Sequence, residues 1–241
     1  MSTPRDVAMT VNTDGLSAQQ IAQAVTDRKL SALDATEVTL ARIAKHDPVL
    51  NSFTDITAER ARAKARAVDA AIAAGQKVGP LAGVPFAVKN LFDVKGLSTR
   101  AGSKINRDLA PSSRDATLIE RMEAAGAVLV GALNMGEYAY DFTGENVHEG
   151  PSRNPHDPTR MTGGSSGGSG SAVGGALVPV NCDMNVAISK SCVKDNASIS
   201  TRPCNSEACW FPLNVRSELN TARIPSGYRS RTDFADTATF I

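Results

Sequence analysis

The first seventy residues show apolar positions at helical spacing, with polar side chains between them. Ser17 begins a capping-box pattern that opens one helix, and Ser31 opens a second. A third helix is expected over residues 58–74, where alanine alternates with charged side chains up to a terminating Gly75. Residues 1–78 are therefore predicted to form a helical layer rather than a partner-binding helix, and nothing in them indicates chemistry.

Two later runs are almost wholly apolar, which is typical of strands buried on both faces. They cover residues 84–88 and 127–132, and between them Asp115 is expected to cap a helix that ends at Gly126. Strand, helix and strand in this order indicate a parallel sheet of the α/β class. Residues 79–180 are predicted to form this core.

A segment of four glycines and three serines, residues 163–169, follows a polar stretch that is expected to be loop over residues 146–162. Its composition also fits a flexible linker. It continues directly into the small apolar residues 171–180, which are expected to form a closely packed helix that leads to a strand. An ordered loop is therefore favoured, in which glycines let backbone N–H groups approach a ligand.

The amino-acid composition changes sharply near residue 180. Of 19 glycines only Gly227 lies beyond it, whereas all four cysteines do: Cys182, Cys192, Cys204 and Cys209. Such a break is unusual within one domain. Residues 181–241 are therefore predicted to be a tail foreign to the preceding domain, with a divergent continuation as the alternative.

The balance of charged and apolar residues excludes several classes of partner. The net charge is +1, so no nucleic-acid partner is expected. No apolar run approaches the ~20 residues of a membrane span, and residues 1–11 have no signal-peptide core, so a cytoplasmic protein is predicted. With three scattered histidines and no Cys-x-x-Cys spacing, neither a metal nor a cofactor is expected.

Lys89 directly follows the first apolar run and is the first candidate for chemistry. Burial disfavours a charged ammonium, so a neutral amine that is competent as a general base becomes accessible near neutral pH. The alternative is a lysine that extends from the strand end into water.

The glycine–serine segment admits two other chemistries, and the residues argue against both. A phosphate-binding P-loop needs a lysine after its glycines, and none is present. A nucleophile elbow centred on Ser165 or Ser166 needs a later histidine, but His46, His148 and His156 all come earlier. A serine–lysine system remains.

Five blocks in a fixed order resemble the amidase-signature family: residues 83–90, 101–103, 133–135, 150–155 and 163–169. The resemblance implies a mixed sheet covered by helices, incomplete after residue 180, and an amidohydrolase acting on a small-molecule amide. Residues 102–107 and 154–157 are most similar to the carboxybiuret hydrolases of that family. The A subunit of glutamyl-tRNA(Gln) amidotransferase shares most of the blocks, and a small partner subunit or a homodimer remains open.

The resemblance also implies a Ser–cis-Ser–Lys triad. Lys89 matches the lysine base, Ser165 matches the cis-serine that relays the proton, and the nucleophile slot 24 residues further on holds Ser189. The rest of the loop matches the family's substrate-side loop through Gly163, Gly164, Ser166, Gly167 and Gly168. The residues before Ser189 are not the family's glycines, so a non-catalytic remnant is the alternative to an active enzyme.

Overall fold

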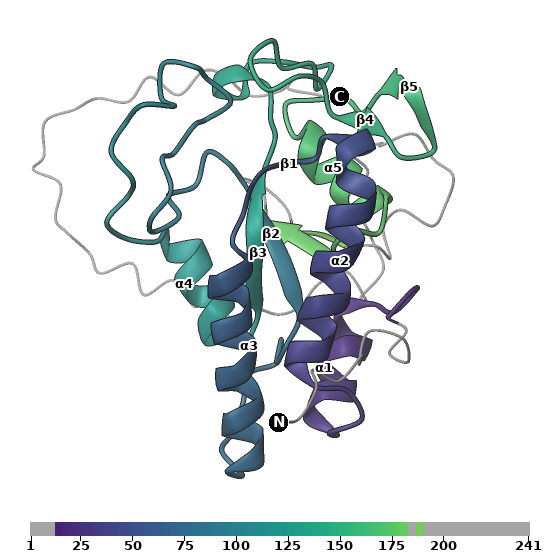
Figure 1. Ribbon diagram of the computed structural model, residues 1–241, viewed down its shortest axis with the longest axis vertical. Helices are drawn as coiled ribbons and strands as arrows, with labels where there is room; N and C mark the ends of the chain where they lie inside the picture. The colour runs from purple at the N-terminus through teal and green to yellow at the C-terminus, as the bar shows by residue number, and fades with distance from the viewer. Residues whose placement is uncertain (1–12, 183–186, 190–241) are drawn as a thin grey trace, which may run out of the picture. The chain divides into compact units, whose positions relative to one another are not determined.

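The computed structural model describes residues 13–182 and the backbone of residues 187–189. Its helices, coloured by position in Figure 1, are α1 Ala18–Thr26, α2 Ala32–Leu50, α3 Ala58–Ala73, α4 Thr117–Ala124, the short 3-10 helix η2 Glu137–Ala139 and α5 Gly167–Gly174. The predicted tail, apart from the short stretches at its start, lies outside the described residues. The boundaries proposed at residues 78 and 180 stay predictions.

Five strands form the main sheet, in the spatial order β1-β3-β2-β6-β7. Their bounds are β1 Phe53–Ile56, β2 Pro85–Lys89, β3 Val128–Leu133, β6 Val180–Cys182 and β7 Ala187–Ser189. Strand β2 runs parallel to both β3 and β6, while β1 and β7 pair antiparallel at the two edges. The predicted parallel pair and the predicted mixed α/β class are therefore confirmed.

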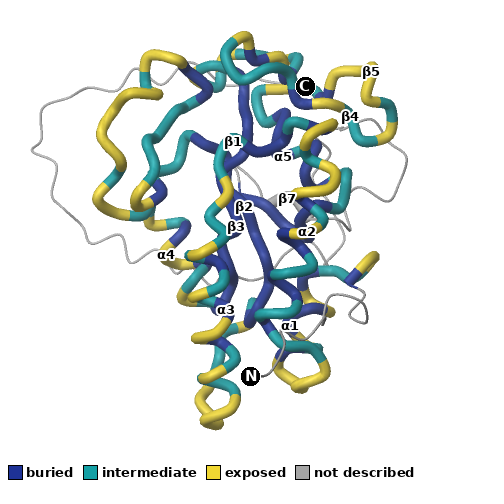
Figure 2. Tube along the Cα trace, viewed as in Figure 1, coloured by how far each residue is buried: buried dark blue, intermediate teal, exposed yellow. Residues whose placement is uncertain are grey.

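The centre of the sheet is buried because helices flank its two longest strands. Every residue of β2 and β3 is buried, and both strands are dark blue in Figure 2. Their apolar side chains join those of α2, α3 and α5 in one hydrophobic cluster. Removal of this apolar surface from water stabilises the fold by roughly 25 cal/mol per Å².

The sequence signals for helix ends are mostly confirmed. Ser17 makes the capping box with α1, and the Ser31 side chain accepts from a backbone N–H in the first turn of α2. Gly75 and Gly126 follow α3 and α4 with positive φ angles, as terminating glycines do. The prediction for Asp115 is wrong, since the N-cap of α4 is the next residue, Ala116, and Asp115 instead binds the Arg60 guanidinium with two bonds of 2.8 Å.

Three other sequence predictions need correction. The first seventy residues are not all helical, because the four-residue β1 joins the sheet through backbone pairing although only Phe53 in it is buried. Residues 146–162 are not all loop, since β4 Arg153–Asn154 and β5 Asp157–Met161 form an exposed hairpin whose two prolines and lack of apolar alternation conceal it. Helix α5 begins at Gly167, inside the segment expected to be loop, because close packing outweighs the low helix propensity of glycine.

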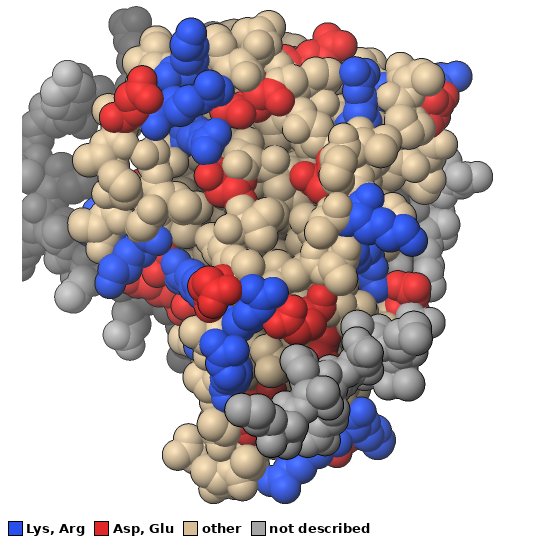
Figure 3. Space-filling view, in the orientation of Figure 1, with Lys and Arg blue, Asp and Glu red and all other residues tan. Residues whose placement is uncertain are grey.

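Charged side chains of both signs are interspersed on the face shown in Figure 3. Within residues 13–182 no helix is both long enough and apolar enough to cross a bilayer.

Candidate active site

Lys89 lies at the C-terminal end of the central strand β2 and is only 2% exposed. Its Nζ atom is 2.8 Å from Ser165 Oγ and 2.8 Å from Ser166 Oγ. The predicted contact between Lys89 and the first of the paired serines is therefore present, and the second serine is equally close. One amine within hydrogen-bond reach of two hydroxyls is an arrangement that permits proton transfer.

Backbone hydrogen bonds also hold the segment before α5 in place. Gly164 N–H donates to Phe142 O at 2.9 Å, and Gly136 N–H donates to Ser165 O at 2.9 Å. The peptide bond between Gly164 and Ser165 is cis, as the resemblance implied. These bonds connect the Gly–Ser loop to the chain that follows β3 and hold Ser165 in front of Lys89.

Close backbone approach explains why glycine occupies two positions of this loop. A Cβ atom added at Gly164 would collide with the Asp141 carboxylate, and one added at Gly168 would collide with Ser52 O and Asn134 O. Gly168 N–H also donates to Asn134 O at 3.0 Å. The start of α5 therefore packs directly against the residue before β1 and the residue after β3.

Asp141 organises the loop on which the Gly–Ser segment rests. Its carboxylate accepts hydrogen bonds from Thr143 N–H at 2.9 Å, from Thr143 Oγ1 at 2.8 Å and from Gly144 N–H at 2.7 Å. Partial burial opposes the charged form, but these hydrogen bonds outweigh it and hold the pKa of Asp141 below its ordinary value. Sequence reasoning missed this residue, because its only local signal is an Asp close to a glycine.

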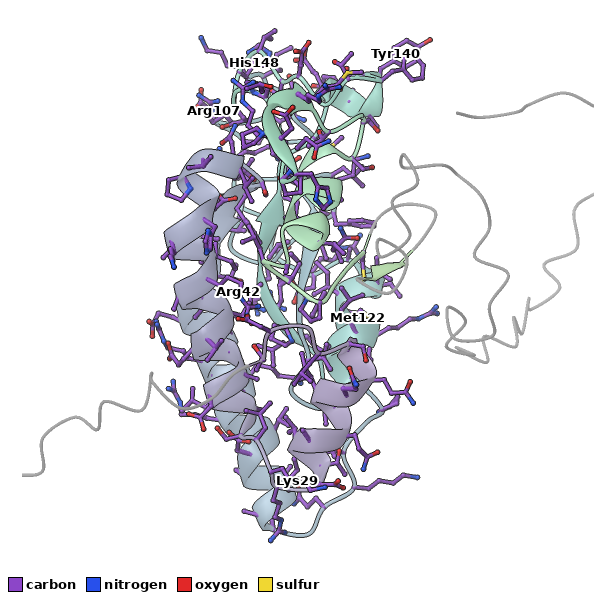
Figure 4. The ribbon with its side chains drawn as sticks, turned by 90° about the vertical axis from the view of Figure 1, so that its right-hand side faces the viewer. Lys29, Arg42, Arg107, Met122, Tyr140 and His148 are labelled. Atoms are coloured by element: carbon purple, nitrogen blue, oxygen red, sulfur yellow. The ribbon has the colours of Figure 1, made fainter. Side chains whose placement is uncertain are left out.

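A second group of polar side chains surrounds Glu137 in η2. Ser103 Oγ donates to Glu137 Oε1 at 2.6 Å, and His148 Nε2 lies 3.1 Å from the same oxygen. The hydrogen bond from Ser103, followed by that from His148, lowers the pKa of Glu137. In Figure 4 His148 and Arg107 lie close together at this end of the molecule, where Arg107 donates to His148 O.

Ser189 is not brought to the Lys89 end of the sheet. It stands opposite Val180, which pairs with Phe86, three residues before Lys89 on β2. Three residues of strand correspond to roughly 10 Å along the sheet, and β6 lies between the two strands. This register places the backbone of Ser189 away from Lys89, whereas the hydroxyls of Ser165 and Ser166 lie within hydrogen-bond distance of it.

Elsewhere, a surface hollow of about 430 Å³ lies between α2 and the residues after α5. Arg42, His46 and Pro155 are among the residues that line it, and none of the predicted site residues does. It therefore adds nothing to the chemistry of the lysine and the serines.

The mixed sheet and the buried lysine beside paired serines define the class of protein. The sequence profile of the amidase family matches residues 34–182, and the chain belongs to this family. The match covers β2 with Lys89 as well as the whole Gly–Ser loop, and it ends at the last residue of β6.

Two relatives show which members of the family the chain resembles. It is 54% identical over 162 residues to the AtzE subunit of 1-carboxybiuret hydrolase from Pseudomonas sp. (strain ADP), an alignment that covers 67% of this chain and 35% of the relative. It is 48% identical over 165 residues to the A subunit of glutamyl-tRNA(Gln) amidotransferase from Azotobacter vinelandii (strain DJ / ATCC BAA-1303), with coverage of 68% and 34%. The chain thus spans about a third of the length of these relatives.

Solved structures agree with this assignment. One, described as an unexpected vestigial protein complex that reveals the evolutionary origins of an s-triazine catabolic enzyme, has a TM-score of 0.68 at 52% identity and covers 69% of this chain and 36% of that one. A bacterial aryl acylamidase of the amidase-signature family has a TM-score of 0.66 at 32% identity, with coverage of 69% and 34%.

Proposed function

We propose that this chain provides the lysine and relay-serine part of an amidohydrolase that cleaves the C–N bond of a small linear amide or urea-like substrate of the carboxybiuret type. The observation that carries the proposal is the buried Lys89 amine, 2.8 Å from both Ser165 Oγ and Ser166 Oγ. The identity of 54% to a 1-carboxybiuret hydrolase subunit supports the choice of substrate class.

The proposed mechanism is nucleophilic catalysis through a Ser–cis-Ser–Lys relay. Neutral Lys89 accepts the proton of Ser165, which in turn accepts the proton of the nucleophilic serine as that serine attacks the amide carbonyl carbon. The tetrahedral intermediate collapses, the relay returns a proton to the leaving nitrogen, and ammonia departs. Water then attacks the acyl carbon while the same relay accepts its proton. The bond between the acyl carbon and the serine oxygen breaks, and the relay returns the proton to that oxygen.

Ser189 is our candidate for the nucleophile because it occupies the sequence slot 24 residues after Ser165. Its register opposite Val180 and the absence of glycine at residues 186–188 favour a second candidate function, in which the chain holds the lysine and relay but lacks a working nucleophile loop. A role like that of the A subunit of the amidotransferase is a further alternative, supported by the 48% identity to that relative.

We also propose that the protein assembles with a partner subunit, because both relatives are named as subunits. A homodimer is the alternative. We further propose that the protein acts on a small-molecule amide and is located in the cytoplasm.

Ammonia release from carboxybiuret-type amides and from glutamine tests the proposal. Residues 1–241 would be compared with a chimera that joins residues 1–182 to the remaining part of the AtzE relative. Release from the carboxybiuret amide by both proteins supports an active chain with Ser189 as nucleophile, and release by the chimera alone supports the second candidate function. Activity on glutamine alone would favour the amidotransferase role, and no activity in either protein would contradict the proposal.

A further inference from the structure

Asn146 has a buried side chain whose polar atoms are all hydrogen-bonded. It is 3% exposed. Its Nδ2 donates to Gly102 O and to Met135 O, both at 2.7 Å, while its Oδ1 accepts from His148 N–H at 2.8 Å and from Glu149 N–H at 2.9 Å. A single amide therefore joins three segments of loop that have almost no secondary structure of their own.

The first Nδ2 bond leads towards Lys89. Gly102 N–H donates to Asn90 Oδ1 at 3.1 Å, and Ala101 N–H donates to Asn90 O at 3.0 Å. Asn90 is the residue that follows Lys89 at the end of β2. Gly102 has a φ of +70°, and an added Cβ atom would lie 2.7 Å from Met135 O, so the backbone at Gly102 packs directly against that of Met135.

The second Nδ2 bond leads towards Ser165. Met135, whose carbonyl accepts it, directly precedes Gly136. Gly136 N–H donates to Ser165 O at 2.9 Å. The same nitrogen thus anchors one segment bonded to the neighbour of Lys89 and another bonded to Ser165 itself.

We infer that Asn146 is a positioning residue, whose two donated hydrogen bonds set the distance between Lys89 Nζ and Ser165 Oγ. The effect of Asn146 on ammonia release rests on the proposed function, whereas its effect on the distance between Lys89 and Ser165 does not. A proton relay needs donor and acceptor within about 3 Å, and a displacement of about 1 Å caused by a remote residue costs on the order of a hundredfold in rate.

Two variants and one control separate positioning from general stability. Asn146→Ala removes all four bonds, and Asn146→Asp keeps the shape and the two accepted bonds while it removes both donated ones. Asn106→Ala is the control, because Asn106 lies on a neighbouring loop with only weaker bonds of 3.2 Å to Arg100 O and Tyr138 Oη. Denaturant unfolding establishes that each variant is folded.

The first measurement does not depend on turnover. In residues 1–241 with 13C at the lysine Cε positions, the NMR signal of Lys89 is identified by its loss in Lys89→Arg. We expect this signal to move from its wild-type position in both Asn146 variants and to stay unchanged in Asn106→Ala. An unchanged Lys89 signal in a folded Asn146→Asp variant would overturn the inference, and so would failure of both Asn146 variants to fold, since Asn146 would then serve overall stability.

The second measurement is ammonia release by the same proteins. We expect kcat to fall about a hundredfold in both Asn146 variants, with KM within about threefold of wild type. A rise in KM with unchanged kcat would overturn the inference. If residues 1–241 release no ammonia, the same variants are measured in the chimera of residues 1–182 with the remaining part of the AtzE relative. No ammonia from that chimera either would contradict the proposed function, while the Lys89 signal still decides the role of Asn146.

Discussion

At the scale of single residues, the candidate site consists of one amine and two hydroxyls at equal distance. Lys89 Nζ lies 2.8 Å from the Oγ atoms of Ser165 and Ser166, and the proposed mechanism uses only the first of them. The two serines differ in their backbone contacts, because Ser165 O accepts from Gly136 N–H whereas Ser166 is the N-cap residue of α5. Geometry alone therefore makes both serines candidates, and their substitution separates them.

Ser165→Ala is expected to lower kcat for ammonia release by roughly a thousandfold or more, because the proton relay is interrupted. Ser166→Ala removes one hydrogen bond of about 1 kcal/mol and should lower kcat for ammonia release by less than about tenfold. The assay is ammonia release from a carboxybiuret-type amide. It is made in residues 1–241 if that chain is active, and in the chimera if only the chimera is active. Equal losses in the two variants would contradict the role given to Ser165.

Asp141→Asn is expected to destabilise the fold in a pH-dependent way. The folded-state pKa of Asp141 lies below its unfolded value, so the carboxylate stabilises the fold above the unfolded pKa of about 3.9, and this contribution is lost as pH falls through the folded pKa. Because asparagine cannot accept from Gly144 N–H with its amide nitrogen, we expect a loss of about 1–2 kcal/mol near neutral pH.

Urea unfolding near pH 7, pH 5 and pH 3 measures the difference in the free energy of unfolding between wild type and Asp141→Asn. The difference between wild type and Asp141→Asn should be constant above pH 5 and should shrink towards pH 3. Asp108→Asn, at an exposed position of a nearby loop, is the control and should have little effect at any pH. A difference that grows as the pH falls would contradict this assignment.

The residues with a chemical signal were predictable from the sequence, and those that act through loop geometry were not. Lys89 follows an apolar run and Ser165 lies in an unusual Gly–Ser segment, so both stand out. Asn146 lies in a polar stretch and Asp141 lies between two aromatic residues, Tyr140 and Phe142, so neither has a local pattern that indicates its role. Only the folded loops show that the side chain of Asn146 is buried. The contribution of such residues depends on contacts that no local pattern encodes.

At the scale of elements, apolar runs and capping signals predicted the central strands and the helices, but the edge of the sheet was missed. Strand β1 has four residues, and it is held by backbone pairing with β3 rather than by an apolar face of its own. Gly131 in β3 permits this pairing, because it leaves room for the Phe53 ring and the Asp55 carbonyl. A strand defined by its partner leaves little pattern in the sequence.

Gly131→Ala is therefore expected to destabilise the fold by about 1–3 kcal/mol, because its Cβ atom would collide with Asp55 O and press on the Phe53 ring. Gly75→Ala is a suitable control: it has open space around it and only the strain of a φ of +69°, worth about 1 kcal/mol. Denaturant unfolding of both variants gives the comparison. A smaller loss at Gly131 than at Gly75 would show that the β1–β3 pairing is not tight.

At the scale of the whole molecule, the amidase match and the change in composition coincide. The match ends at residue 182, and glycine becomes rare and cysteine frequent from about the same point. An oxyanion site needs backbone donors held in a tight turn, and Val186, Ala187 and Ile188 precede Ser189. We therefore expect residues 1–241 to release ammonia at least a hundredfold more slowly than the chimera with a family nucleophile loop, and comparable rates would contradict this expectation.

The central claim is that Lys89 is the general base of an amidohydrolase site, and Lys89→Ala in the chimera tests it most directly. Lys45→Ala is the matched control, because Lys45 is exposed on α2. With carboxybiuret-type amide as substrate, we expect Lys89→Ala to lower kcat for ammonia release by roughly a thousandfold or more, with unchanged folding, and Lys45→Ala to keep wild-type kcat. Ammonia release by Lys89→Ala at the rate of Lys45→Ala would contradict the account.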